Sequence, residues 1–406
     1  MGAWEKYVEA ECNIPFDRYT QFPFYLRVWH YPADNTLRLM WFSDHYMSDG
    51  ISGLVVLNDV LTFAAQISRD ASVRAVALPL RPTLYDFWLR PRGWWSLKTS
   101  QALVKLIGKL AFRSEMASFK SSLPIREDQT DFQVPVQINS SAILFGQGER
   151  DSMLRAIKRC KEENVTLFGA IAASIMVAYY IAKDAASPKC FVESEDPLFK
   201  VAAELDYNMR QRVEFPAPEV QVGCFYTGAE IERFSKQGVD MKAEGFWDLA
   251  RQVKQSVDEQ LEGFMLPFQL ILVDEHVTTD KLVKFARDVP IPQCVASDVD
   301  ISNVGKYPHA KVHSFTTTGE AAEALTVSTV HVCSSIPHLG PAVGMYISSV
   351  DTLCYSMMHK HEPEDARTLF DAFTTSLETA GDVATGDKMI DVVNRVRKLL
   401  EKEAQQ

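Results

Sequence analysis

Residues 43–50 read Ser-Asp-His-Tyr-Met-Ser-Asp-Gly, and the sequence on both sides of this stretch decides the fold that we expect. On the amino-terminal side, segments 24–29 and 37–42 alternate apolar residues with other residues, which is typical of half-buried strands. The residues between them, Tyr-Pro-Ala-Asp-Asn-Thr at 31–36, favour a turn. The sequence therefore predicts an antiparallel hairpin that leads directly into residues 43–50.

A helical pattern follows on the carboxy-terminal side. Apolar side chains recur at spacings of three and four between Leu54 and Ala65, as in a helix that packs on a sheet. His45 and Asp49 therefore lie at a strand-to-helix junction. Side chains at such a junction can project into a cavity from a rigid base.

His45, Asp49 and Gly50 are the residues at this junction that suit chemistry. A neutral imidazole has a pKa of about 6.5 and can accept a proton at physiological pH. A carboxylate four residues later can orient the ring or brace the loop, and glycine removes a Cβ where the chain turns. The structural alternative is an exposed histidine in a turn, with Asp49 capping a helix that begins at Ile51. These residues alone leave both interpretations open.

The remainder of the chain alternates strand-like and helix-like segments, which predicts an α/β protein with sheets covered by helices. Helical patterns lie at 149–163, 166–182, 246–262 and 363–378. The second of these is apolar almost all round and should be buried. Strand-like runs lie at 136–145, 199–205, 221–227, 325–332 and 345–355. The polar segment 121–135 is the expected linker between an amino-terminal lobe, 1–135, and a carboxy-terminal lobe, 136–406.

Composition excludes several classes of protein. Lys and Arg total 42 and Asp and Glu total 53, so the net charge of −11 disfavours binding to a nucleic acid. The longest apolar run, 167–182, is short for a membrane span, and the amino terminus lacks the apolar region of a secretory signal. We therefore expect a cytoplasmic protein without stable membrane insertion.

Cysteine and histidine spacing gives no metal site. The seven cysteines are scattered and never form C-x-x-C, which suits thiols in a reducing compartment. His359 and His361 flank Lys360 on an expected loop, where exposure to solvent is the simpler interpretation than metal binding. No dinucleotide, P-loop, H-E-x-x-H or G-x-S-x-G motif occurs.

Residues 44–50 resemble the H-H-x-x-x-D-G motif of the superfamily that contains chloramphenicol acetyltransferase, plant-type acyl-CoA-dependent acyltransferases, alcohol acetyltransferases and nonribosomal condensation domains. The resemblance places the catalytic histidine on His45, the motif aspartate on Asp49 and the motif glycine on Gly50. Asp44 stands where the motif has its first histidine. Several members of the superfamily keep only H-x-x-x-D.

A second resemblance concerns residues 205–218, which read Leu-Asp-Tyr-Asn-Met-Arg-Gln-Arg-Val-Glu-Phe-Pro-Ala-Pro. This segment is similar to the N-x-R-x-R…P-x-P segment of the superfamily, and Val-Gly-Cys-Phe-Tyr at 222–226 lies where relatives have a G-x-F element. In relatives, an arginine of the first segment pairs with the motif aspartate across the two lobes. The resemblance therefore implies that Arg210, or as second choice Arg212, braces Asp49.

A third resemblance concerns residues 300–306, Asp-Ile-Ser-Asn-Val-Gly-Lys. They resemble the S-N-x-G turn of the second lobe, near which thioester substrates approach in relatives. The resemblance implies that Ser302, Asn303 and Gly305 contact substrate.

Taken together, the resemblances imply two chloramphenicol-acetyltransferase-like lobes, each a mixed β-sheet covered by helices, with an active-site channel between them. They imply that His45 is the general base that moves an acyl group, acetyl for preference, from acyl-CoA to a hydroxyl of a small apolar acceptor. An amine is the other possible acceptor. Acyl-CoA would be a co-substrate, with no bound cofactor and no metal, and the protein would be a monomer.

Two alternatives remain open. In the first, the donor is a thioester on a carrier protein, as in condensation-type amide formation. In the second, the chain is a truncated or degenerate relative without catalysis, because only 44 residues precede His45 and relatives have a longer segment there. An incomplete first lobe would expose apolar sheet surface and lower stability.

Overall fold

The computed structural model describes most of the residues of the chain. They are 2–17, 19–68, 82–84, 86, 94–105, 114, 118–129, 141–186, 198–212, 221–262, 271, 295–316, 323–337 and 339–405.

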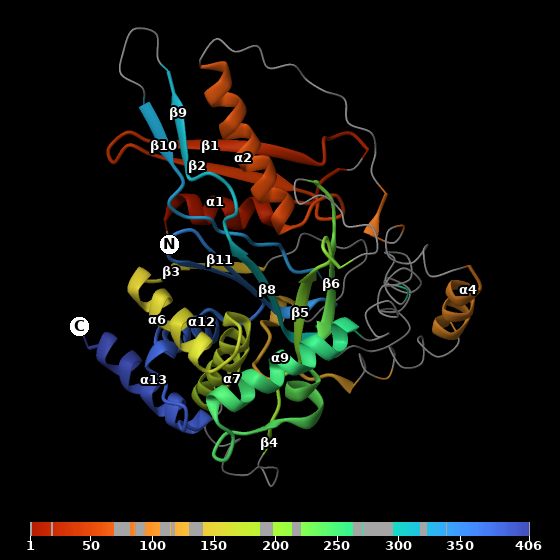
Figure 1. The fold of residues 1–406 in the computed structure, drawn as a ribbon, viewed down its shortest axis with the longest axis vertical. Helices are drawn as coiled ribbons and strands as arrows, with labels where there is room; N and C mark the ends of the chain where they lie inside the picture. The colour runs from red at the N-terminus through yellow and green to blue at the C-terminus, as the bar shows by residue number, and fades with distance from the viewer. Residues whose placement is uncertain are drawn as a thin grey trace.

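A six-stranded mixed sheet forms the centre of the carboxy-terminal part of the chain (Figure 1). Its strands, in spatial order, are β3 (Ala142–Gln147), β12 (Leu353–His359), β11 (Pro341–Ser349), β8 (Ser297–Lys306), β5 (Ala203–Asn208) and β6 (Tyr226–Glu230). Strand β8 runs parallel to both β11 and β5, and the other neighbours are antiparallel. The register sets Asp300 of β8 beside Glu204 of β5 and Gly344 of β11.

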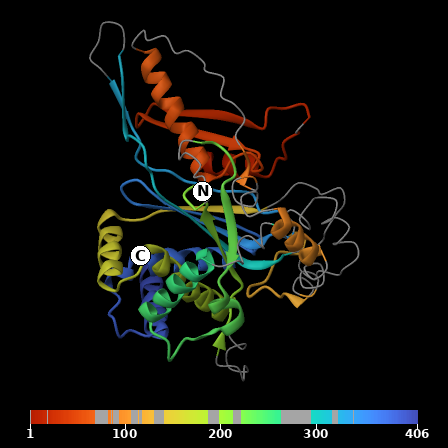
Figure 2. The same cartoon turned by 45° about the vertical axis from the view of Figure 1, so that its right-hand side comes forward.

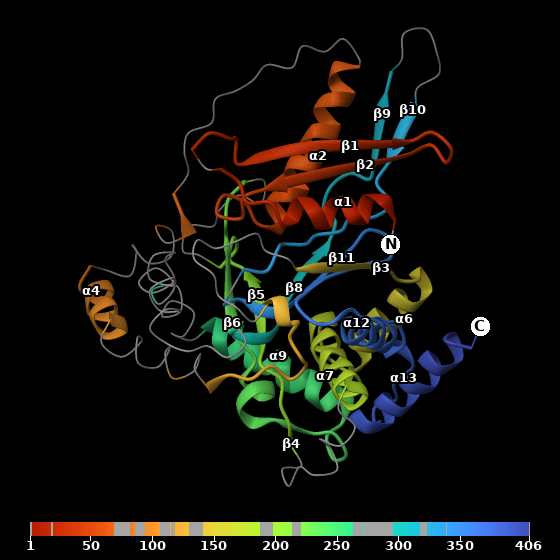
Figure 3. The ribbon, with the colours of Figure 1, turned by 180° about the vertical axis from the view of Figure 1, so that it is seen from behind.

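Helices cover one face of this sheet, as the opposite views of Figures 1 and 3 show. They are α6 (Arg150–Glu162), α7 (Leu167–Ala186), α9 (Phe246–Glu262), α12 (Pro363–Glu378) and α13 (Met389–Glu403). Leu205, Ile301 and Met345 belong to the apolar cluster that includes the inner residues of these helices. Because side chains alternate along a strand, residues 206, 300, 302 and 346 project from the other face.

That other face looks towards a smaller group of elements (Figures 1 and 2). They are α1 (Ala3–Cys12), β1 (Phe24–Tyr31), β2 (Thr36–Ser43) and α2 (Gly50–Ile67), joined by β9 (Val312–Phe315) and β10 (Glu323–Thr326) from later in the chain. Strands β1 and β2 pair antiparallel from Phe24 opposite Ser43 to Tyr31 opposite Thr36. The hairpin and the helix predicted around residues 43–50 are therefore confirmed.

Several shorter elements complete the described structure. They are α4 (Trp94–Leu103), the paired strands β4 (Leu198–Phe199) and β7 (Val239–Asp240), the 3₁₀ turns Glu127–Gln129 and Ala380–Asp382, and a π-helical turn at Arg233–Gln237.

The four helices predicted in the second part of the chain are confirmed as α6, α7, α9 and α12. The single strand predicted at 345–355 was wrong, because the structure has two antiparallel strands there, β11 and β12. The turn expected at 300–306 was also wrong, since these residues lie in β8. Helices α1 and α13 were not predicted.

Three other predicted strands are displaced. The run at 199–205 is divided between β4 and β5, β6 begins only at Tyr226, and β10 ends at Thr326 instead of continuing to 332. The first five residues of the strand expected at 136–145 lie outside the described residues, and the remainder forms β3.

The proposed lobe boundary between residues 135 and 136 also lies outside the described residues. The described part of the expected linker is attached to the sheet. Asp298 accepts hydrogen bonds from the backbone and the hydroxyl of Ser122, and Ile125 forms a β-bridge with His361. The described part of the expected linker therefore packs along the carboxy-terminal sheet.

Two described helices, α2 and α7, are long and apolar enough to cross a membrane by length and composition. The apolar run expected to end at residue 182 belongs to a helix that continues to Ala186. Most of α7 is buried in the core, whereas only 28% of α2 is buried. Burial in the core accounts for the apolar composition of α7, and the position of α2 along a cavity is described below.

Candidate active site

Asp49 joins the strand-to-helix junction to the carboxy-terminal sheet. Its carboxylate forms two parallel bonds with the guanidinium of Arg210, with Nη1 at 2.7 Å from Oδ2 and Nη2 at 3.0 Å from Oδ1. The same carboxylate accepts hydrogen bonds from the backbone of Ser52, at 2.8 Å, and of Phe225, at 3.0 Å. Asp49 is therefore both the amino-terminal cap of α2 and one half of a buried ion pair.

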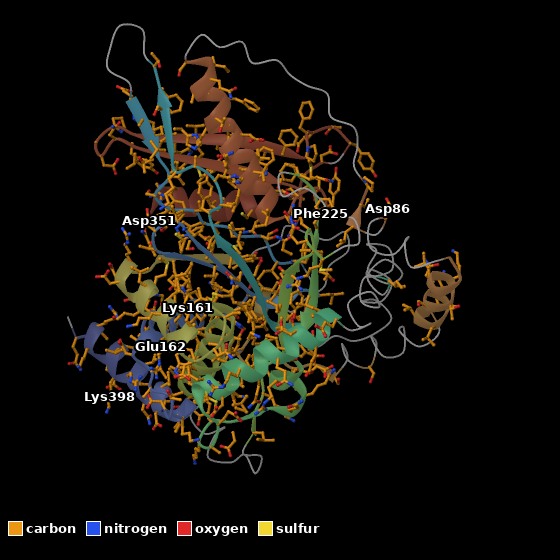
Figure 4. The ribbon with its side chains drawn as sticks, viewed as in Figure 1. Asp86, Lys161, Glu162, Phe225, Asp351 and Lys398 are labelled. Carbon is orange, nitrogen blue, oxygen red and sulfur yellow. The ribbon has the colours of Figure 1, made fainter. Side chains whose placement is uncertain are left out.

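Arg210 is 1% exposed, and its surroundings explain why it can be buried. Its Nη2 also donates to the hydroxyl of Ser52 and to the carbonyl of Gln221, and its guanidinium lies 4.9 Å from the ring centre of Phe225. Phe225 is labelled in Figure 4, just before the start of β6. Burial tends to raise the pKa of Asp49, but hydrogen bonds and charge from Arg210 outweigh burial and hold that pKa below its ordinary value.

The predicted brace between Asp49 and Arg210 is present in the structure, and the capping role proposed as its alternative is present too. The helix begins at Gly50, one residue earlier than expected. A Cβ on Gly50 would lie 3.3 Å from a methyl group of Val304, so glycine allows close approach to β8. Arg212, the second choice for the brace, is exposed.

His45 is held in one orientation by the same junction. Its Nδ1 lies 2.9 Å from the carbonyl oxygen of Ser48, and its ring stacks on Tyr226 with centres 5.3 Å apart. A carbonyl oxygen can only accept a hydrogen bond, so Nδ1 carries the hydrogen of the neutral ring and Nε2 carries the lone pair. The geometry leaves Nε2 as the proton acceptor.

A cavity of about 2000 Å³ lies between this junction and the uncovered face of the large sheet. His45 and Asp49 line it on one side, and Tyr226, Ser302 and Tyr346 line it on the other. The cavity also extends along α2, past Leu54, Leu57 and Leu61, to the β9–β10 hairpin. The apolar side of α2 therefore faces this hollow, which accounts for its incomplete burial.

Two carboxyl groups on the cavity wall were missed by the sequence analysis. Asp206 of β5 and Asp300 of β8 both line the cavity, and burial is the main reason why the pKa of each is raised, to about 6 for Asp206 and well above the ordinary range for Asp300. Asp206 is hydrogen-bonded to Ser302 and lies in the field of His45. The only sequence signal was that each lies between two largely apolar residues of a strand, Leu205 and Tyr207 for Asp206 and Val299 and Ile301 for Asp300.

The three residues predicted to contact substrate do not form a turn. Ser302 and Asn303 line the cavity from β8. Gly305 has a positive φ of 82°, at the irregularity where β8 pairs with β11, and its backbone donates to the side chain of Asn303 at 3.2 Å. The structure thus brings Ser302 and Asn303 to the cavity and gives Gly305 a backbone role.

The histidines expected on an exposed loop are buried. His359 ends β12 and His361 follows it, at 2% and 0% exposure, and burial lowers the pKa of His361 to about 4. His361 contacts the carbonyl of Pro124 through Nδ1, and Lys360 donates to the carbonyl of Pro337. Through these contacts Lys360 and His361 link the end of β12 to the chain at Pro337 and Pro124. Within the described ranges, no cluster of three or more His, Cys, Asp or Glu side chains is arranged to hold a metal.

This chain is similar to known proteins in its structure. Neither a protein-family model nor a curated protein matches the sequence. Among solved structures, the first condensation domain of the calcium-dependent antibiotic synthetase superposes with a TM-score of 0.59 at 10% identity, over 96% of this chain and 73% of that chain. The chain has the condensation-domain fold.

Two further structures with the condensation-domain fold widen the comparison. The trichothecene 15-O-acetyltransferase from Fusarium sporotrichioides has a TM-score of 0.59 at 12% identity, over 89% of this chain and 70% of that chain. The epimerization domain from the third module of tyrocidine synthetase B has a TM-score of 0.53 at 12% identity, over 94% and 77%. The expected two-lobed α/β architecture is confirmed, and these likenesses describe the condensation-domain fold alone.

Proposed function

We propose that this protein transfers an acyl group from a thioester to a hydroxyl or amine acceptor, with His45 as general base. One observation carries the proposal: Nδ1 of His45 is tied to the carbonyl of Ser48, so Nε2 is the free proton acceptor beside the large cavity. The likeness to an acetyltransferase and to condensation domains supports the reaction class.

The proposed reaction needs no covalent acyl-enzyme. Nε2 of His45 takes the proton of the acceptor as the acceptor oxygen or nitrogen attacks the thioester carbonyl. The tetrahedral intermediate then breaks its carbon–sulfur bond, and the imidazolium returns the proton to the departing thiolate. Asp49 and Arg210 are positioning residues in this scheme, because they fix the loop that holds the imidazole.

We further propose that the donor is free acyl-CoA, acting as a co-substrate, and that the protein works as a cytoplasmic monomer. The acceptor would be a small apolar molecule, which suits the leucines of α2 along the cavity. The second candidate donor is a carrier-protein thioester, and the condensation domains among the structural neighbours favour it.

The test is a thiol-release assay with acetyl-CoA and longer acyl-CoA donors against a panel of alcohols and amines. We expect His45→Ala to lower kcat by about 10²–10⁴-fold, the usual effect of removing a positioned base. His30→Ala removes an exposed histidine on β1 and should leave the rate unchanged.

Three outcomes separate the alternatives. An unchanged rate in His45→Ala would show that His45 is not the base. Turnover only with an acyl-loaded carrier protein would show that the donor is the carrier-protein thioester and not acyl-CoA. If wild-type protein turns over neither donor, the chain is a non-catalytic relative.

A further inference from the structure

The wall opposite His45 carries two carboxyl groups that the proposed reaction does not use. Asp206 and Asp300 project from neighbouring parallel strands, β5 and β8, on the uncovered face of the sheet. Their charges interact with each other, and Asp206 also interacts with His45. The pair therefore lies within electrostatic reach of the catalytic imidazole.

The pair has no basic partner among the described side chains. Asp206 is hydrogen-bonded to Ser302, but Oδ1 of Asp300 is buried and has no hydrogen-bond partner among the residues that the structure describes. Burying a carboxylate away from water without a counter-charge is unfavourable. Such a group is stabilised either by holding a proton or by meeting a cation.

The described cavity lining is rich in negative charge. Carboxyl groups come from Glu11, Asp44, Asp49, Asp206, Asp300 and Glu323. The guanidinium groups of the same lining come from Arg38 and Arg210, of which Arg210 is bound to Asp49 and Arg38 lies over the ring of Trp4, 4.3 Å from its centre. A cationic group that enters this part of the cavity is attracted.

Two tyrosines complete the surroundings of the pair. Tyr226 and Tyr346 line the cavity from β6 and β11, and both lie in the field of Asp206 and Asp300. Aromatic rings beside carboxylates are a common arrangement around organic ammonium groups, because the ring face attracts positive charge.

We propose that Asp206 and Asp300 bind a cationic nitrogen of the acceptor, so that the acceptor is an amino alcohol or a diamine whose second group faces His45. This inference rests on the proposed acyl transfer and narrows the acceptor class, from a small apolar molecule to one whose apolar carbon chain ends in a cationic nitrogen. The ammonium group supplies the hydrogen-bond donors that Oδ1 of Asp300 lacks, and the far end of the molecule presents the hydroxyl or amine that is acylated.

Proton release is a second consequence. Burial raises the pKa of both carboxyl groups, to about 6 for Asp206, so the pair holds its protons to a higher pH than exposed carboxyl groups do. The other titratable groups that face the pair are His45 and Asp49 from the junction, Glu204 on β5, Tyr226 on β6 and Tyr346 on β11. A bound cation favours the ionised pair, so binding should release a proton to the buffer.

The experiment uses two probes that differ by one group, 6-aminohexan-1-ol and heptan-1-ol, with the full chain and an accepted thioester donor. We expect the amino alcohol to have a KM lower by about 10–100-fold, the range given by charged hydrogen bonds. Asp206→Asn and Asp300→Asn should remove most of this preference, measured as the ratio of the two KM values within each variant. Glu323→Gln, at the exposed end of the same cavity, should retain it.

Calorimetry tests binding independently of turnover. Titration of 6-aminohexan-1-ol in buffers of different ionisation enthalpy should show proton release with wild-type protein and none with Asp300→Asn, and cooperative thermal unfolding will confirm that the variants are folded. Equal KM values for the two probes, or binding without proton release, would overturn the inference. Loss of turnover for both probes together with intact, proton-linked amine binding would count against acyl transfer and leave the amine site standing.

Discussion

At the scale of single residues, the carboxylate of Asp49 accepts hydrogen bonds from three different residues. It caps α2 through the backbone of Ser52, bonds the backbone of Phe225 and forms two bonds with Arg210. The sequence motif suggested either a cap or a brace. Both are correct, because one carboxylate has enough lone pairs to accept all of these hydrogen bonds.

The first prediction concerns this ion pair. Arg210→Met keeps the apolar volume but leaves Asp49 buried without its partner, so we expect the free energy of unfolding to fall by about 3–5 kcal/mol at pH 7. Urea unfolding followed by tryptophan fluorescence measures this loss. The double variant Asp49→Asn, Arg210→Met is the control and should recover part of it, whereas equal losses in both proteins would show that the charge is unimportant.

The ion pair also has a pH dependence. Because the pKa of Asp49 is lower in the folded chain than in the unfolded chain, its stabilising contribution is complete above the unfolded value of about 3.9. That contribution is lost as the pH falls through the lower, folded value. Arg210→Met should therefore differ least from wild type in strong acid.

The proximity of Asp206 and Asp300 could not be predicted from single residues. Both lie in segments that resemble superfamily motifs, but neither is a motif position, and their proximity depends on the parallel register of β5 and β8, in which Glu204 lies beside Asp300. Register between strands almost a hundred residues apart is set by tertiary packing, which local patterns do not encode.

At the scale of elements, helices were easier to predict than strands. Helices α9 and α12 have strong amphipathic periodicity and were predicted with their observed ends. Strands β11 and β12 are buried on both faces for most of their length, so no alternation marks the short turn between them. The turn expected at 300–306 was implied by a resemblance, whereas these residues lie in β8, from which Ser302 and Asn303 line a cavity.

The second prediction tests how tightly α7 and α9 pack. A Cβ on Gly169 would lie 2.7 Å from the backbone oxygen of Ala250, and a backbone atom cannot rotate away. Gly169→Ala should lower the free energy of unfolding by about 1–3 kcal/mol, the usual effect of overpacking. Thermal and urea unfolding both measure it.

Gly53 in α2 provides the matched control, because its added methyl group would meet only Trp41, at 3.9 Å. Gly53→Ala should be neutral or stabilising by up to about 1 kcal/mol, since alanine favours helix. Equal effects at the two positions would mean that the α7–α9 contact is looser than the structure indicates.

At the scale of the whole molecule, the site exists only because two groups of elements face each other. The junction between β2 and α2 supplies His45 and Asp49, the large sheet supplies Tyr226 and the two carboxyl groups, and the turn after β5 supplies Arg210. The resemblance of short motifs to a known superfamily predicted this arrangement. The size of the cavity and the negative charge of its wall could not be predicted, because both arise from the assembled fold.

The third prediction concerns the pH dependence of overall stability. Burial raises the pKa of Asp206 to about 6, so between about pH 4 and pH 6 the folded chain holds a proton that the unfolded chain has released. Stability therefore falls as the pH rises through this window. Asp206→Asn removes this penalty, so its melting temperature should exceed that of wild type by more at pH 8 than at pH 4.

Calorimetric melting at both pH values gives the comparison. Glu323→Gln, which changes an exposed carboxyl group of β10, should shift the melting temperature equally at both. If Asp206→Asn behaves in the same way as Glu323→Gln, the carboxyl group of Asp206 is not withdrawn from water.

The shared carboxylate of Asp49 has a mechanical consequence. One side chain both caps the start of α2 and links the junction to the carboxy-terminal part of the chain. The two attachments therefore depend on the same carboxylate. If Asp49 moved away from Arg210, the start of α2 would lose its cap as well. We therefore expect the junction that carries His45 to stay in place when a substrate enters the cavity.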